Sequence, residues 1–177
     1  MATWIAPKAA ILRVSPPVGD EGLRIKGSFT VGELTPAIHP DIYGVHIRVI
    51  DRNGKLIVDE TIPGGSPNKF IRWKATGNPQ TQWMYTDKSK HTGHNGISRV
   101  FIRRKLSAPN TFSVQVTGNK GLYPLLIGDD PIRVTFELNS NALPPGGTPG
   151  RDQCGEVQFG KLVKPRCKFV GANLNCM

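Results

Sequence analysis

The sequence predicts an all-β protein, an antiparallel β-sandwich of the immunoglobulin-like or jelly-roll-like kind. Apolar and polar residues alternate with a period of two along most of the chain, and the spacing of an amphipathic helix is not sustained anywhere. Gly 20 and Pro 15 together make up about a fifth of the 177 residues, so turns divide the chain into short segments. Many short strands separated by such turns are typical of sandwiches and barrels.

The first clear strands lie in the N-terminal third. In residues 23–31 every odd position except Gly27 is apolar and every even position is polar, as in a strand with one buried face. Residues 45–50 and 55–62 then form the arms of a predicted hairpin. Its turn contains Asn53-Gly54, which we expect to supply the positive φ angles of a tight turn.

Five more strands are predicted downstream. Residues 70–74 and 82–86 flank the turn at Gly77-Asn78-Pro79, and a polar loop at 87–96 comes next. The remaining strands are 98–104, 111–117 and 132–138. Their apolar side chains share one parity and are the predicted core: Val100, Ile102, Phe112, Val114, Val116, Ile132, Val134, Phe136 and Leu138.

The C-terminal part of the chain has a different composition. Residues 1–138 are expected to form the sandwich, and the stretch 139–150 is so rich in Pro and Gly that it is predicted to be a linker. Residues 151–177 are predicted to form a small cysteine-containing hairpin that packs on the sandwich. Its expected arms are 156–159 and 167–170.

All three cysteines, Cys154, Cys167 and Cys176, lie in this last segment. They lack the paired CxxC spacing of a zinc site, so one disulfide and one remaining thiol are expected, together with an oxidising compartment. The bridge could join Cys167 to Cys176 or Cys154 to Cys167, and the sequence does not choose between them.

The chain is strongly basic, with 23 Lys and Arg against 13 Asp and Glu and a net charge of +10. This balance favours polyanionic partners such as anionic polysaccharide or nucleic acid, although basic residues also simply keep a sheet solvated. The candidate polyanion-binding residues occupy the parity opposite the core: Arg24, Lys26, Arg48, Arg72, Lys74, Arg99, Arg103, Lys105 and Arg133. Trp73 and Trp83 are possible stacking partners for a ligand, but core positions are the more common place for tryptophan in a sandwich.

Enzyme motifs are absent, including the G-x-S-x-G elbow, the phosphate-binding loop and the calcium loop. Only the loop containing Asp87, His91 and His94 offers a set of groups for a metal-dependent hydrolase. The two histidines are three residues apart in a glycine-containing loop, so a solvated polar loop is the favoured interpretation. We therefore expect no cofactor and no catalytic activity.

No window reaches the roughly 18 to 20 apolar residues that span a bilayer. The opening residues also have neither the basic start nor the apolar run of a signal peptide. If the parent protein is exported by such a leader, we expect it to lie outside this chain.

Several short segments together carry a resemblance. They are 23–27, the turn at 51–54, the basic strand after Gly96-Ile97, the segment 112–121, and the tail with Gln153-Cys154-Gly155-Glu156, Cys167-Lys168-Phe169 and Cys176. In this order they resemble C-terminal β-sandwich modules of large, uncharacterised secreted bacterial proteins. The resemblance implies a secreted or cell-surface, non-catalytic module that is a fragment of a longer exported protein.

We therefore expect a structural or adhesive module that acts through its surface. Its expected partners are other protein surfaces, further copies of itself or anionic polysaccharide, with nucleic acid less favoured. The alternatives are a dedicated cationic binder of polysaccharide or nucleic acid, and the metal-dependent hydrolase built on the histidine loop.

Overall fold

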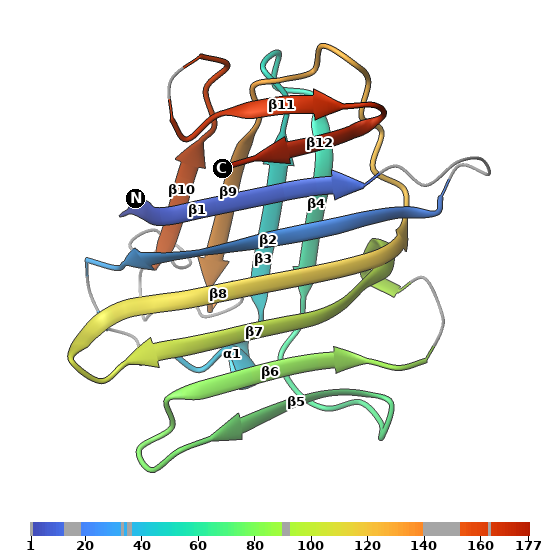
Figure 1. Cartoon of the computed structure of the whole chain (residues 1–177). Helices are drawn as coiled ribbons and strands as arrows, with labels where there is room; N and C mark the ends of the chain where they lie inside the picture. Colours follow the sequence, from blue (N-terminus) through green and yellow to red (C-terminus); the bar gives the residue numbers. More distant parts are fainter. Residues whose placement is uncertain are drawn as a thin grey trace.

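The protein folds as the expected β-sandwich in a computed structural model that describes residues 2–12, 19–32, 34, 37–89, 93–139, 153–162 and 164–177 (Figure 1). The first six strands are β1 (Ala2–Leu12), β2 (Glu21–Thr30), β3 (Val45–Ile50), β4 (Leu56–Ile62), β5 (Ile71–Thr76) and β6 (Gln82–Asp87). The others are β7 (Ile97–Lys105), β8 (Ala108–Gly121), β9 (Arg133–Leu138), β10 (Cys154–Gln158), β11 (Cys167–Val170) and β12 (Asn173–Cys176). One short helix, α1 (Pro40–Tyr43), and one helical turn, η1 (Gly93–Gly96), complete the described elements.

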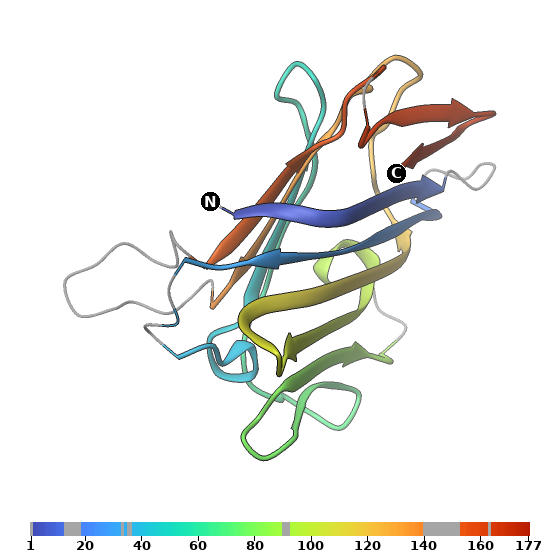
Figure 2. The ribbon, with the colours of Figure 1, turned by 60° about the vertical axis from the view of Figure 1, so that its left-hand side comes forward.

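The strands form two layers. The back sheet has the order β4-β3-β9-β10, and the front sheet has the order β11-β12-β1-β2-β8-β7-β6-β5. In Figure 1 the front sheet faces the viewer, and its strands run across those of the back sheet. Figure 2 shows the two layers from another side. Apart from one parallel pair, β1 with β10, all pairs of the named strands are antiparallel.

Strand β1 belongs to both layers. Its first residues pair in parallel with β10 of the back sheet, where Ala2 lies opposite Gly155, and its last residues pair with β12 of the front sheet. Along its length it also pairs with β2, with an irregularity between Ile5 and Lys8. The sequence analysis did not predict this strand, because the irregularity interrupts the alternation of apolar and polar residues.

The core between the sheets is the one the sequence predicts. All nine predicted core side chains are buried, and the aromatic rings of Phe29 and Phe136 meet across the layers with centroids 6.3 Å apart. Trp73 and Trp83 are also buried, which agrees with the core positions favoured for them over a role in stacking on a ligand. Neither tryptophan is therefore available to stack on an external ligand.

The hairpin at residues 45–62 is confirmed, but its turn differs from the expected one. Only Gly54 of the Asn-Gly pair has a positive φ, of 83°. The turn is instead held by Asp51, whose carboxylate accepts hydrogen bonds from the backbone N–H groups of Asn53 (2.7 Å) and Lys55 (2.8 Å). Because the aspartate side chain closes the turn, Asn53 need not adopt a left-handed conformation.

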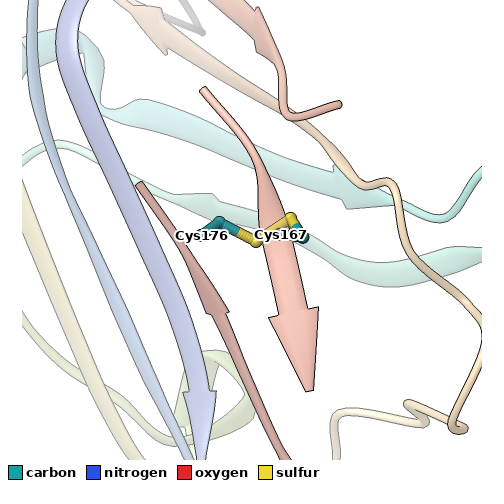
Figure 3. Close-up of a disulfide and its surroundings, with 2 residues drawn as sticks. All are labelled: Cys167 and Cys176. Carbon is teal, nitrogen blue, oxygen red and sulfur yellow. A yellow bond between two sulfur atoms is a disulfide. The ribbon is translucent and has the colours of Figure 1, made fainter. Parts of the chain in front are cut away.

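The C-terminal segment contains the expected disulfide but not the expected pairing of strands. Cys167 and Cys176 form the disulfide, which is one of the two pairings left open (Figure 3). Cys154 is buried and lies outside this disulfide. The expected arms 156–159 and 167–170 do not pair with each other. Strand β10 instead joins β9 in the back sheet, and β11 pairs with β12. Of the predicted linker, only Asn139 lies within the described residues.

Asn139 fixes the end of β9 through a buried polar network. Its side-chain oxygen accepts a hydrogen bond from the backbone N–H of His39 at 2.8 Å. Its amide nitrogen donates to the carbonyl of Ala37 and to the side chain of Gln153, each at 2.9 Å. This fully buried residue therefore ties three separate segments of the chain together.

Candidate functional site

The outer surface of the front sheet collects most of the predicted polyanion-binding residues. We call this surface the cationic face. Seven of the nine predicted residues are exposed on its strands, with Lys105 at the end of β7: Arg24, Lys26, Arg72, Lys74, Arg99, Arg103 and Lys105. The other two, Arg48 and Arg133, are on the outer surface of the back sheet and belong to a different site.

Two further cations of this face were missed by the sequence analysis. Lys8 on β1 lies directly opposite Lys26 on β2, and Lys168 on β11 lies opposite Asn175 on β12. Lys8 reaches this side of the sheet just after the β1 irregularity, where Ala6 has a φ of 47°. No alternation of apolar and polar residues in the sequence indicates that Lys8 points to this surface. The short alternating run at 167–169, in contrast, could have predicted an outward position for Lys168.

The cationic face carries no acidic side chain at the outward positions of its described strands. The carboxylates in these strands belong to Glu21 and Asp87, which have the parity of the core residues Leu23 and Tyr85. Among the described residues, none of the lysines and arginines of the face takes part in an ion pair. Their positive charges therefore add together without local compensation.

The outer surface of the back sheet has the opposite character. His46 on β3 lies between two carboxylates, with Nε2 2.6 Å from Asp59 and Nδ1 3.1 Å from Glu137. The hydrogen bond with Glu137, assisted by the one with Asp59, raises the pKa of His46 above its ordinary value of 6.5. Arg133 similarly has Glu156 at 3.9 Å. The charges of this surface are thus largely balanced.

Two hollows lie on the cationic face. The larger, of about 460 Å³, is bounded by strands β12, β1, β2 and β8, and its lining includes Lys8, Arg24, Lys26 and Asn175. The smaller, of about 130 Å³, is lined in part by Lys74, Met84 and Phe101. Polar and charged groups around a partly apolar floor are what a binding site for a small ligand unit requires.

Phe101 and Met84 supply the apolar part of this face. They lie opposite each other on β7 and β6 and are half-buried, although both point away from the core. The guanidinium Nη2 of Arg99 lies 3.6 Å from the sulfur of Met84. Phe101, which was not predicted as a site residue, is therefore an aromatic side chain that a ligand on this face can reach, whereas Trp73 and Trp83 are buried.

The residues of the hydrolase hypothesis have local structural roles where they are described. Asp87 accepts hydrogen bonds from the backbone N–H (2.8 Å) and hydroxyl (2.6 Å) of Ser89. His94 packs edge-on against Tyr85, with ring centroids 6.1 Å apart, and burial raises the pKa of Tyr85 to about 12. His91 lies outside the described residues. Within the described part of the chain, no three His, Cys, Asp or Glu side chains are grouped so as to hold a metal ion.

No protein-family model, curated protein or solved structure matches this chain. Among the described residues, no helix has the length and apolar character needed to cross a membrane. The function proposed below therefore rests on the geometry of the chain itself.

Proposed function

We propose that the protein is a non-catalytic adhesive module that binds anionic polysaccharide through its cationic face. The observation that carries this proposal is the separation of charge between the two surfaces of the sandwich. Exposed cations gather on the front sheet with no carboxylate at the outward positions of its described strands, whereas on the back sheet His46 and Arg133 each lie against a carboxylate. Solubility alone does not require unpaired cations on one surface and ion pairs on the other.

The pairing of Lys8 with Lys26 strengthens this argument. Like charges directly opposite each other in an antiparallel pair destabilise the sheet, and Arg24 lies on the same side of β2 only two residues away from Lys26. All three side chains are exposed, so water and salt screen part of this repulsion, and no carboxylate among the described residues pairs with them. An anionic ligand at the larger hollow would relieve it.

The disulfide favours polysaccharide over nucleic acid. The Cys167–Cys176 bridge is of a kind that persists in oxidising compartments, where proteins meet cell-surface and extracellular polysaccharides. Sequence-tolerant binders of single-stranded nucleic acid also commonly stack successive bases on several aromatic rings. Among the described side chains of the front-sheet strands, Phe101 is the one aromatic ring that points outward, and the exposed Phe70 lies just before β5.

The test compares two double variants that lose equal charge from different surfaces. Arg24→Gln with Lys74→Gln removes two positive charges from the cationic face, and Arg48→Gln with Arg133→Gln removes two from the back sheet. On a column of immobilised sulfated polysaccharide, the wild type should be retained at low salt and released as the salt concentration rises, since binding releases counterions. The front variant should elute at clearly lower salt than the back variant.

Two outcomes would contradict the proposal. Equal elution of the double variants would mean that net charge alone governs retention. Stronger retention of the wild type on immobilised single-stranded DNA than on the polysaccharide, at equal salt, would assign the face to nucleic acid instead.

A further inference from the structure

The cations of the front sheet are arranged in a regular row across its strands. Strand register places Arg24 on β2 opposite Thr117 on β8, and Thr117 opposite Arg99 on β7. Arg99 in turn lies opposite Thr86 on β6, and Thr86 opposite Arg72 on β5. Arginine and threonine therefore alternate over five neighbouring strands, and we call these five residues the arginine row.

The row has a defined repeat. Neighbouring strands are about 4.8 Å apart, so the Cα atoms of successive arginines, two strands apart, are separated by about 10 Å. This is close to the length of two linked sugar rings. A nucleic acid strand, in contrast, carries a charged phosphate on every nucleotide.

The side chains of the row also differ in height above the sheet. The arginines are long and exposed, whereas Thr117 and Thr86 are short and half-buried. Each threonine thus marks a low position between two guanidinium groups. A guanidinium binds a carboxylate or sulfate through paired hydrogen bonds, and a threonine hydroxyl can both donate to and accept from a sugar hydroxyl.

Other features of the face lie at one end of the row and beside its middle. Beyond Arg24 it continues through Ala10 to Asn175, and the larger hollow is lined by Arg24, Thr117 and Asn175. Beside Arg99 lie Met84 and Phe101, which offer an apolar surface for the C–H face of a sugar ring.

We propose that the ligand is an extended polysaccharide with one acidic group in each disaccharide, and that it crosses the strands of the front sheet along the arginine row. This rests on the function proposed above and narrows its ligand class. An acidic group on every second sugar would meet each arginine in turn, and the intervening neutral sugars would lie over the threonines.

Two matched pairs of single variants test the row. Arg99→Gln and Arg103→Gln each remove one exposed charge from β7, but only Arg99 belongs to the row. Arg72→Gln and Lys74→Gln make the same comparison on β5. With hyaluronate oligosaccharides as the probe, loss of a row arginine should weaken binding about tenfold, as expected for loss of a charge-assisted hydrogen bond. Its partner variant should weaken binding less than threefold.

Ligand length and charge spacing provide a second measurement. The row from Arg24 to Arg72 spans four strand intervals, about 19 Å, so affinity should rise with chain length and level off near four to five sugars. Hyaluronate, with one carboxylate per disaccharide, should bind at least as tightly as oligogalacturonate of equal length, which carries one on every sugar.

The outcomes separate this inference from the proposed function. If the two members of each pair weaken binding equally, or if oligogalacturonate binds more tightly, the cationic face is a diffuse charged surface and the row is refuted, while polysaccharide binding stands. If neither the sulfated column nor the oligosaccharides retain the wild type, the proposed function itself fails.

Discussion

Removing the disulfide should destabilise the whole protein by an amount that can be worked out from the chain. The bridge joins Cys167 on β11 to Cys176 on β12, nine residues apart, and Cys176 also lies opposite Ala9 of β1. It therefore fastens the edge strand β11 to β12, which in turn pairs with β1, the strand that links the two layers. The perturbation is the double variant Cys167→Ala with Cys176→Ala, which leaves no buried hydroxyl behind.

The expected loss follows from the closed loop. With nine residues in the loop, the chain-entropy relation gives a reduction of the free energy of unfolding of about 2.6 kcal/mol at 25 °C. For a protein of this length, each kcal/mol corresponds to a change in Tm of about 2 to 4 °C, so the Tm should fall by about 5 to 10 °C.

Thermal unfolding followed by circular dichroism measures this change. Wild type treated with a reductant should match the double variant, and the reductant should have no further effect on the variant. The single variant Cys167→Ala should cost about as much as the double one, since either removes the bridge. A double variant within about 1 °C of the oxidised wild type would refute the reasoning, because the loop would then impose no constraint on the unfolded chain.

Three further predictions concern single side chains. Asn139→Ala should lower the free energy of unfolding in urea by about 2–3 kcal/mol, since the three hydrogen bonds of this buried side chain are lost; an unchanged midpoint would contradict the network. The folded-state pKa of His46 is raised above 6.5, so its stabilisation is complete below that pH and is lost as the pH rises through the folded-state value. Denaturation between pH 6 and 8 should show a loss of up to about 1 kcal/mol that is absent in His46→Gln. Gly118→Ala would place a Cβ atom 2.3 Å from the hydroxyl of Tyr123 and should cost about 1–3 kcal/mol. Gly32→Ala, which meets no described atom within 4 Å, should change stability by less than about 0.5 kcal/mol, and equal costs for the two glycines would count against the packing argument.

The periodic pattern of the sequence predicted which side of each strand is buried. Val134 and Phe136 are in the core and Arg133 is exposed because side chains of neighbouring residues point to opposite sides of a strand, whatever its partners. The same rule separated Arg99 and Arg103 from Val100 and Ile102.

The pattern does not encode which strands are neighbours. Arg48 and Arg72 obey the same alternation rule, but one strand joins the back sheet and the other the front, so only Arg72 reaches the cationic face. Pairing is decided by contacts distant in the sequence, as when β10 joins β9 and β1 in place of β11. For the same reason the arginine row could not be foreseen, since it depends on the register of five strands.

The sequence analysis also missed features that depend on local backbone geometry. Lys8 reaches the cationic face only after the irregularity in β1, and the hairpin turn is closed by a side chain of Asp51 in place of a left-handed asparagine. Such details follow from hydrogen bonds that a pattern of apolar and polar letters does not contain.

The position of β1 has a mechanical consequence for the adhesive role proposed above. Tension applied near Ala2 reaches a strand that is hydrogen-bonded to β10 on one side of the sandwich and to β2 and β12 on the other. The pull is thus shared by three neighbours in both layers, so neither layer can peel away from its neighbour by itself. A molecule that holds a surface under flow benefits from such an anchorage.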